Sequence, residues 1–542
     1  MEREKKMKVA VIGMGYVGLV TAISLAEVGN EIIAIEKNSI KLEKLKLGIS
    51  PIYEPNIQQY LKKHKENIQF ESNYEKLNED VKVIFICVGT PENKDGTADT
   101  RSVYEAINEI IDNNVLAKDI IIVIKSTVPI GTNKDIEKLI KNKTNKNIKI
   151  VSNPEFLSQG TAIDDAINPQ RIVLGTDSKE AIKILKLVYK KNNRRYVITD
   201  SNTAELIKYA CNSFLALKIS YMNELANICE LIDGNIKDLE KGMGTDKRIG
   251  KYFLKSGVGY GGSCFPKDTK ALVKLAEREG YEIKTLEAAI LVNKNQRIKL
   301  IEKAKKYYKN FNNLNIAILG TSFKPNTDDI RESAAIDNIN ILLNEKANIK
   351  VYDPVSLEII KEKYKNSIEY CNNIDEAITG ADLCLIFTEW KEIKEYKINN
   401  VEAIKVKKIE IIERITDANG SISENILTSW EHKNQFIPEI IRFGELKIYL
   451  QERIVKKNDS DVYLSKYEYD ILLLLAKSPG RIFGKEMVYD LVWNEPYSGD
   501  YNVVMRHICN IREKIEDDPG QPLYIQTVRG VGYRFNGNLG SE

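Results

Sequence analysis

One stretch of the chain combines a thiol, a cation and a carboxylate with several glycines. Residues 257–268 read Gly-Val-Gly-Tyr-Gly-Gly-Ser-Cys-Phe-Pro-Lys-Asp. A thiol becomes a reactive nucleophile where nearby positive charge lowers its pKa, and Lys267 lies three residues after Cys264. Glycine lets the main chain approach a ligand closely. We therefore interpret Cys264 as a nucleophile, with an inert buried cysteine in a glycine-rich turn as the alternative.

The composition describes an ordinary globular chain of several domains. The 542 residues are 43% hydrophobic and 29% charged with a net charge of +3, so overall charge indicates neither a membrane nor a nucleic acid partner. The seven cysteines are scattered without C-x-x-C spacing, so we expect neither a disulfide framework nor a metal site. No signal peptide or long apolar run is present, and we expect a cytoplasmic protein.

The N-terminal region has the pattern of a dinucleotide-binding unit. Apolar residues 8–12 precede Gly13-Met-Gly-Tyr-Val-Gly18, a helical stretch covers 19–28, and a second apolar run at 31–35 ends in Glu36. The spacing fits a tight turn at a helix N-terminus that holds a pyrophosphate, followed by an acid that binds ribose hydroxyls. A carboxylate repels a 2′-phosphate, so NAD is favoured over NADP. The adjacent Lys37 weakens this preference.

Three further predicted strands, at 81–88, 120–125 and 148–151, place polar residues just beyond their carboxyl ends. These residues are Thr90, Thr127 and Glu155. Ligands bind at this edge of a doubly wound sheet. The alternatives are helix-capping threonines and a solvated loop carboxylate.

A helical pattern over 203–231 is long enough to bridge two domains and to pack on a second copy of the chain. Lys208 and Asn212, four residues apart, share one of its faces, which is either a catalytic face or a solvent-exposed stripe. A further amphipathic helix is predicted over 283–304.

A second α/β pattern spans residues 312–430, with strands predicted at 315–320, 349–352 and 383–388. It carries no dinucleotide fingerprint. Its first loop contains Lys324 and Arg331, which we expect to hold phosphate. Ordinary surface cations are the alternative.

The last 110 or so residues form another predicted domain. Short strands are expected at 440–450 and 453–457, helices from Leu464 and over 485–493 and 500–515, and a hairpin over 524–535 with its turn at 529–532. Ser465 and Glu468 have the spacing of a capping box.

Taken in order, the motifs over roughly residues 7–430 resemble the nucleotide-sugar dehydrogenases, and within them the UDP-glucose 6-dehydrogenases. The resemblance implies an NAD site formed by Gly13, Gly15, Gly18, Glu36, Thr90, Thr127, Lys267 and Arg331. It implies a catalytic set of Cys264, Lys208, Asn212, Asp268, Glu155 and Thr127. It implies substrate contacts by Glu155, Phe156, Leu157, Lys208, Asn212, Arg248, Tyr252, Lys255, Tyr260, Gly261, Phe323 and Lys324.

The implied reaction removes two hydrides from C6 of UDP-glucose, through a thiohemiacetal and then a thioester on Cys264, and consumes two NAD per sugar. Lys208 and Asn212 would stabilise the oxyanion, while Asp268, Glu155 and Thr127 would activate water. The resemblance also implies a homodimer joined through the long helix, with an arginine shared between subunits. One departure is Gln159, where many relatives carry a glutamate near the cofactor.

The C-terminal pattern resembles the winged helix-turn-helix of two-component response regulators. This implies double-stranded DNA as a partner, contacted by Arg506, His507, Asn510, Arg512 and Arg529. Basic and acidic side chains are equal in number over residues 440–535, and Glu513 adds negative charge to the predicted recognition helix, so a dimerisation or docking module is the alternative.

The predicted fold class is α/β: two Rossmann-like doubly wound domains joined by a long central helix, followed by an α+β winged helix. The predicted domains are NAD-binding (1–200), central helical (201–305), UDP-binding (306–430) and winged helix (438–537). The predicted function is NAD-dependent oxidation of UDP-glucose. The alternatives are a nucleotide-sugar-sensing transcriptional regulator and a dehydrogenase for GDP-mannose or UDP-N-acetylmannosamine.

Overall fold

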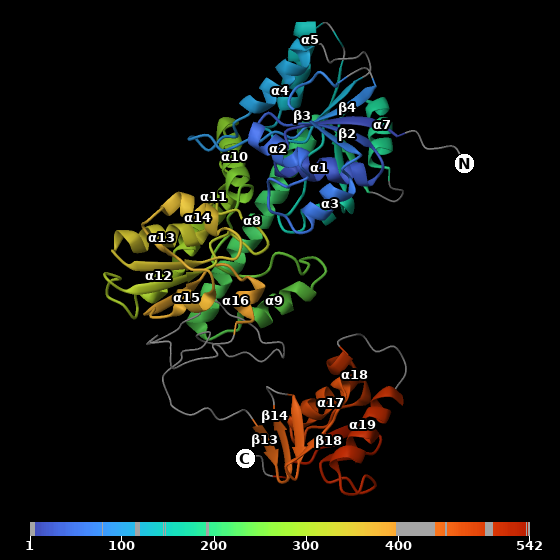
Figure 1. Cartoon of the computed structure of the whole chain (residues 1–542), viewed down its shortest axis with the longest axis vertical. Helices are drawn as coiled ribbons and strands as arrows, with labels where there is room; N and C mark the ends of the chain where they lie inside the picture. Colours follow the sequence, from blue (N-terminus) through green and yellow to red (C-terminus); the bar gives the residue numbers. More distant parts are fainter. Residues whose placement is uncertain are drawn as a thin grey trace, which may run out of the picture. The chain divides into compact units, whose positions relative to one another are not determined.

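The computed structural model describes residues 6–77, 80–113, 120–144, 146, 148–190, 195–396, 440–449, 453–493, 502–537 and 539. The chain folds as two compact units, Met1–Glu431 and His432–Glu542, shown in Figure 1. The predicted boundaries at 430 and 438 lie outside the described residues.

The first unit begins with a mostly parallel sheet whose described strands run in the order β3-β2-β1-β4-β5-β6-β7-β8. Only the β6–β7 pair is antiparallel. The strands are β1 (Lys8–Ile12), β2 (Glu31–Ile35), β3 (Ile68–Glu71), β4 (Val81–Ile86), β5 (Ile121–Ile124), β6 (Lys149–Ser152), β7 (Ile172–Gly175) and β8 (Tyr196–Thr199). Helices on both faces bury β1, β4 and β5, which explains their continuous Val and Ile runs.

The helices of this domain are α1 (Tyr16–Glu27), α2 (Ser39–Lys46), α3 (Ile57–Lys63), α4 (Arg101–Asp112), α5 (Thr132–Thr144), α6 (Ala162–Ile167) and α7 (Lys179–Tyr189). Helix α1 starts three residues before the predicted helix, because the chain turns directly from the glycine loop into it. The predicted doubly wound fold is confirmed.

Helix α8 (Ser201–Ile232) crosses the first unit from the first sheet to the second, as Figure 1 shows. The Asp200 carboxylate caps it by accepting from Thr203 N at 3.0 Å. It is followed by α9 (Ile236–Thr245), α10 (Phe265–Arg278), α11 (Lys284–Arg297) and α12 (Lys299–Ala304).

The single helix predicted over 283–304 is wrong, since the structure breaks it at Ile298 into α11 and α12. Asn338 Nδ2 donates to the Arg297 carbonyl at 2.7 Å, the group that a continuous helix would bond to residue 301. The break therefore coincides with a contact from the next domain.

The second sheet is parallel in the order β11-β10-β9-β12. Its strands are β9 (Asn315–Leu319), β10 (Asn348–Tyr352), β11 (Glu369–Tyr370) and β12 (Leu383–Ile386), and its helices are α13 (Ala334–Asn344), α14 (Leu357–Tyr364), α15 (Ile374–Ile378) and α16 (Lys391–Lys394). Apolar residues pack on both faces of this sheet.

The second unit has an antiparallel sheet of β13 (Ile440–Phe443), β14 (Leu446–Tyr449), β15 (Ile454–Lys457) and β16 (Ser460–Val462). The predicted strand at 440–450 is instead a hairpin, because Gly444 turns the chain with φ of 59°. Helices α17 (Lys466–Ala476), α18 (Lys485–Trp493) and α19 (Asn502–Ile515) and the hairpin β17 (Ile525–Val528) and β18 (Gly532–Phe535) follow.

The Ser465–Glu468 capping box is confirmed, and Phe443 and Phe535 pack in the core with ring centroids 4.4 Å apart. Within the described ranges no helix is both long and apolar enough to cross a membrane.

Candidate active site

The glycine loop between β1 and α1 is shaped for close packing. Gly13 has φ of +89°, and a Cβ on Gly18 would lie 1.7 Å from the Gly13 carbonyl oxygen, so no side chain fits there. Glu36, at the end of β2, accepts from Met14 N at 3.1 Å and from Asn38 N at 2.8 Å. The carboxylate is thereby fixed beside the loop, where a ribose would bind. Lys37 is ion-paired with Glu109 of α4.

The loops after β4 and β5 are tied together at the same edge of the sheet. Thr90 Oγ1 donates to Thr127 O at 2.8 Å, and Ser126 Oγ donates to Val88 O at 2.7 Å. Thr90 and Thr127 therefore lie side by side, as their predicted positions after neighbouring strands require.

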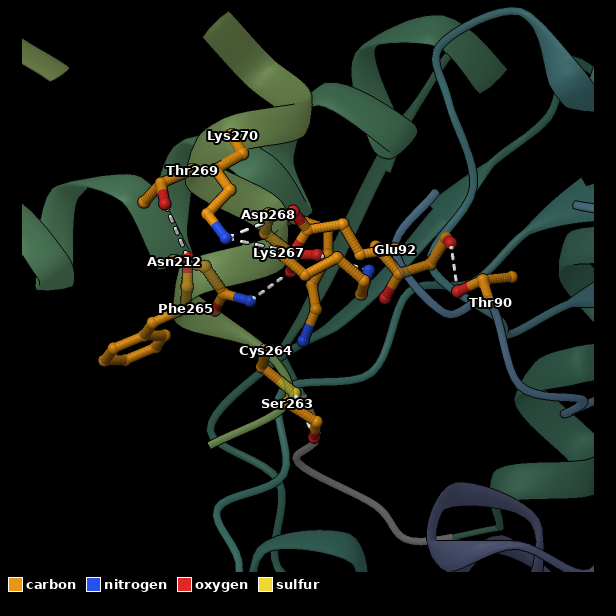
Figure 2. Close-up of polar contacts among 12 residues, drawn as sticks. Thr90, Glu92, Asn212, Ser263, Cys264, Phe265, Lys267, Asp268, Thr269 and Lys270 are labelled. Atoms are coloured by element: carbon orange, nitrogen blue, oxygen red, sulfur yellow. Dashed lines mark hydrogen bonds and ion pairs between the residues drawn. The ribbon is translucent and has the colours of Figure 1, made fainter. Parts of the chain in front are cut away.

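Cys264 is the N-cap residue of α10, and its carbonyl accepts from Asp268 N at 2.8 Å. The residue is exposed, and Ser263 Oγ lies 3.7 Å from its sulfur (Figure 2). Desolvation of the sulfur by the surrounding protein raises the pKa of the thiol, while the charge of the Lys208 ammonium lowers it. The net pKa of Cys264 is above the ordinary value.

Lys208 and Glu155 form a buried ion pair. Lys208 Nζ lies 2.7 Å from both Glu155 Oε1 and Glu155 O, and Glu155 Oε2 accepts from Leu157 N at 2.6 Å. Burial alone would raise the pKa of Glu155, but Lys208 holds it below its ordinary value. Burial alone would lower the pKa of Lys208, but Glu155 and then Cys264 keep it above its ordinary value. Both groups are therefore charged at neutral pH.

A second pair joins α8 to α10, shown in Figure 2. Asn212 Nδ2 donates to Asp268 Oδ2 at 2.6 Å, and Lys267 Nζ donates to Asp268 Oδ1 at 2.6 Å. Asp268 is 1% exposed. Lys208 and Asn212 thus share the face of α8 that meets the cysteine loop, and the solvent-exposed stripe is excluded.

The glycine-rich loop before Cys264 is anchored on two sides. Tyr260 N donates to Asn293 Oδ1 at 2.7 Å, and Gly262 N donates to Arg331 O at 2.8 Å. A Cβ on Gly261 would lie 2.2 Å from the Glu332 carbonyl oxygen, and one on Gly262 would lie 2.8 Å from the Phe323 ring. The second Rossmann-like domain therefore packs directly on this loop.

A cavity of about 370 Å³ adjoins the start of the loop at Lys255 and Gly257, with α8, α9 and α12 around it. Two other predicted substrate residues lie at the surface. The Arg248 side chain is 89% exposed and paired with Asp246, and Tyr252 is 70% exposed. Within one chain, the partner that the Arg248 side chain contacts is Asp246.

The predicted phosphate-binding cations lie where the two Rossmann-like domains meet. Lys324 Nζ donates to Ser158 Oγ at 2.8 Å and lies 5.6 Å from the centre of the Phe323 ring. Arg331 donates to Asp329 from Nε at 2.8 Å and from Nη2 at 2.6 Å. Phe156 stacks under Arg171, 4.0 Å from the ring centre.

Sequence reasoning missed two buried carboxylates. Glu205, one turn before Lys208, accepts from Gly131 N at 2.6 Å and Asn133 N at 2.9 Å, and so fixes the loop that follows Thr127. Glu54 accepts from the amides of Gly160 and Ala162, each at 2.7 Å. For Glu205 the available signal was its i,i+3 spacing from Lys208.

In the second unit, Arg506 and Arg529 are exposed. Asn510 donates to Glu468 at 3.1 Å, and Arg512 donates to Ile525 O at 2.8 Å and to Thr527 Oγ1 at 2.7 Å. His507 packs against Trp493, with ring centroids 5.6 Å apart. Three of the five predicted DNA-contacting side chains are therefore engaged within the domain.

A Rossmann domain with a fixed carboxylate after its second strand is typical of NAD-dependent dehydrogenases. The chain matches the NAD binding domain (residues 7–193), central domain (202–295) and UDP binding domain (317–415) of the UDP-glucose/GDP-mannose dehydrogenase family, and it belongs to that family. Residues 459–535 match the C-terminal domain of transcriptional regulatory proteins.

The chain is 41% identical over 396 residues to UDP-glucose 6-dehydrogenase YwqF of Bacillus subtilis, covering 72% of this chain and 90% of that protein. It is 42% identical over 397 residues to the UDP-glucose 6-dehydrogenase of Rickettsia felis, covering 72% of this chain and 88% of that protein. The solved UDP-glucose dehydrogenase of Pyrobaculum islandicum superposes with a TM-score of 0.69 at 30% identity, covering 76% of this chain and 98% of that one.

Proposed function

We propose that the chain oxidises UDP-glucose to UDP-glucuronate at C6, with Cys264 as covalent nucleophile. The observation that carries the proposal is that the exposed Cys264 shares one site with two buried pairs, Lys208–Glu155 and Asn212–Asp268. The relatives named above are UDP-glucose 6-dehydrogenases, which supports UDP-glucose as the substrate.

The glycine loop and Glu36 fit NAD, which when bound accepts a hydride in each of the two oxidations. The Glu36 carboxylate would accept hydrogen bonds from the ribose hydroxyls and repel a 2′-phosphate. Lys37 does not counter this preference, because Glu109 neutralises it. Thr90, Thr127, Lys267 and Arg331 complete the proposed cofactor site.

The first oxidation gives an aldehyde. The Cys264 sulfur then adds to the carbonyl carbon, and the thiol proton ends on the former aldehyde oxygen, which gives a thiohemiacetal. The aldehyde oxygen becomes negative at this step, and the Lys208 ammonium and Asn212 amide, which here donate to Glu155 and Asp268, would donate hydrogen bonds to it. Oxidation of the resulting thiohemiacetal gives a thioester.

Water then adds to the thioester carbonyl, and the carbon–sulfur bond breaks to release the carboxylate and the thiol. Asp268 and Glu155 are buried carboxyl groups, and the pKa of Glu155 lies below its ordinary value. Either one would take the proton of the water that Thr127 would help to hold. The sugar nucleotide would be enclosed by Phe156, Leu157, Tyr260, Gly261, Phe323 and Lys324. Lys255 lines the cavity beside the loop.

The same proposal includes a homodimer joined along α8. Phe214, Tyr221 and Ile228 are spaced by seven residues and are 61%, 53% and 48% exposed, which forms an uncovered apolar stripe. Arg248 and Tyr252, exposed within one chain, would then reach the partner's substrate. Light scattering of Phe214→Glu should show a monomer. Steady-state kinetics of the same variant should show a raised KM for UDP-glucose.

We further propose that the winged helix binds double-stranded DNA, supported by the match to transcriptional regulatory proteins and by the exposed Arg506 and Arg529. A protein-docking module is the second candidate, favoured by the internal bonds of Asn510 and Arg512. Gel shifts at several salt concentrations decide between them, because phosphate contacts make DNA affinity fall with salt.

The central test counts NADH formed per UDP-glucose consumed by the full chain. Two NADH per sugar, lost in Cys264→Ala, is the expected result. Activity only with GDP-mannose or UDP-N-acetylmannosamine would change the substrate. No turnover with any of the three would leave a nucleotide-sugar-sensing regulator as the better reading.

A further inference from the structure

The first Rossmann-like domain holds the carboxylate at the end of its second strand with few contacts. Gly13, which has φ of 89°, donates from N to Ile35 O at 2.9 Å. The next amide, Met14 N, donates to Glu36 Oε2 at 3.1 Å. Glu36 is only partly buried, so its carboxylate keeps acceptor positions for the ribose hydroxyls of a dinucleotide.

The second Rossmann-like domain repeats this geometry at Asp353, directly after β10. Gly320, which has φ of 83°, donates from N to Tyr352 O at 2.8 Å. The next amide, Thr321 N, donates to Asp353 Oδ2 at 2.7 Å. Asp353 is therefore the counterpart of Glu36, in a domain that has no dinucleotide fingerprint.

The surroundings of Asp353 differ from those of Glu36, because the protein itself fills the acceptor positions of the carboxylate. The Asp353 side chain is buried, with 2% of the residue exposed. Two N–H groups donate to Oδ1, namely Val355 N at 2.9 Å and Ser356 N at 2.7 Å. Three donate to Oδ2, namely Thr321 N at 2.7 Å, Ser322 N at 3.2 Å and Trp390 Nε1 at 3.1 Å. A carboxylate offers about four lone-pair sites, so none is left for a ribose.

Two of these donors belong to the loop that carries the proposed substrate residues Phe323 and Lys324. Thr321 and Ser322 directly precede them, and Ser322 Oγ donates to Lys324 O at 3.1 Å. From the residues after β12, Thr388 Oγ1 donates to Ser322 O. The start of this loop is therefore fixed on one side by Asp353 and on the other by the segment that also supplies the Trp390 indole.

We propose that Asp353, held by Trp390, is a positioning residue for the substrate: it fixes the main chain before Lys324 so that the Lys324 ammonium meets the diphosphate of the sugar nucleotide. The strand-end carboxylate thus has two uses in one chain, as a cofactor ligand in the first domain and as a loop anchor in the second. This inference rests on the proposed role of Lys324 as a substrate contact. Asp353 is buried and acts without touching the ligand.

The test measures the Kd for UDP by calorimetry on the full chain, because UDP carries the diphosphate without the glucose that the catalytic residues bind. Asp353→Asn keeps the size of the side chain but leaves one accepting oxygen, so at least two of the five N–H groups lose their acceptor. We expect UDP to bind about tenfold more weakly. The Kd for NAD should stay within about twofold of wild type, because Glu36 and the glycine loop are untouched.

A double-mutant cycle separates positioning of Lys324 from a general loss of structure. Lys324→Met alone should weaken UDP binding about tenfold, through loss of a charge-assisted contact with phosphate. If Asp353 acts through Lys324, Asp353→Asn should cost less than about twofold more when it is added to Lys324→Met. Trp390→Phe is the milder variant, which removes one donor to Oδ2 and should weaken UDP binding about two- to threefold.

Asp382→Asn is the matched control. Asp382 accepts from Asn315 N at 3.0 Å at the opposite edge of the same sheet, so its substitution tests stability without reaching the loop. The Kd values for UDP and NAD should both be unchanged in this variant.

Three outcomes would overturn the proposal: UDP binding unchanged in Asp353→Asn, equal losses of UDP and NAD binding in that variant, or additive losses in the double variant. If Lys324→Met leaves UDP binding unchanged, the proposed substrate role of Lys324 fails and this inference fails with it. A loss in Lys324→Met with none in Asp353→Asn would overturn the inference alone.

Discussion

The Lys208 ammonium lies 2.7 Å from both the side-chain carboxylate and the main-chain carbonyl of Glu155. Desolvation alone would raise the pKa of both the Glu155 carboxyl and the Cys264 thiol. One cation thus holds the pKa of Glu155 below its ordinary value and partly offsets the rise in the pKa of Cys264. The two effects can be separated by experiment.

Lys208→Met should slow alkylation of Cys264 by iodoacetamide at pH 8. The thiol pKa lies above its ordinary value, so the reactive thiolate increases as pH rises, and loss of the lysine raises that pKa further. The rates of variant and wild type should converge at high pH. Cys264→Ala identifies the labelled site by mass spectrometry, and equal rates at pH 8 would contradict the assignment.

Asp268→Asn should separate oxidation from hydrolysis. If Asp268 activates water, the variant still forms the thioester, and stopped-flow absorbance should show a burst of two NADH per active site followed by a slow phase. The steady-state rate should fall by about 10² or more. An absence of any burst would place Asp268 in the oxidation steps instead.

Cofactor preference should depend on three residues together. Glu36→Ser should raise the KM for NAD about tenfold through loss of charged hydrogen bonds. NADP should remain a poor cofactor, because Lys37 is held by Glu109. Adding Glu109→Gln releases Lys37 for a 2′-phosphate, so the double variant should use NADP better than Glu36→Ser does. Glu109→Gln alone should leave NAD kinetics unchanged.

Two arginines of α19 should behave differently if the second unit binds DNA. Arg506→Ala should weaken DNA binding. It should also reduce the slope of log affinity against log salt concentration by the amount expected for about one phosphate contact. Arg512→Ala should instead destabilise the hairpin β17–β18, by about 2 kcal/mol, because three hydrogen bonds to it are lost. Hydrogen exchange over residues 525–535 reports this loosening, and protection equal to wild type would contradict it.

The stability of the second unit should fall in acid. Burial alone would raise the pKa of Glu468, but Lys514, Ser465 N and Asn510 lower it to about 2. A carboxyl group whose pKa is lower in the folded than in the unfolded state stabilises the fold fully at pH values above its unfolded-state pKa. That contribution disappears as pH falls toward the folded-state pKa of about 2. Calorimetry should show this loss of stability in the wild type. The Glu468→Gln variant, already less stable at pH 7, should lose less of its free energy of unfolding on acidification.

The local parts of the site could be predicted from sequence, since the glycine loop, Glu36 and the Cys264 motif each lie within one short segment. Lys208 and Asn212 followed from helical spacing, although only the fold shows which face meets Cys264. Contacts such as Gln159–Asp329, 170 residues apart, have no local signal. The break at Ile298 was missed for the same reason, because Asn338 lies 41 residues from Arg297.

Helix α8 carries Glu205, Lys208 and Asn212 in its first half and the exposed Phe214, Tyr221 and Ile228 after them. Because each residue advances an α-helix by about 100°, a single insertion between Lys208 and Asn212 would turn one partner away from the cysteine loop. An insertion after Asn223 would leave the chemistry in phase and rotate only the distal apolar side chains. The proposed catalytic face and the proposed dimer face of helix α8 can thus be changed separately.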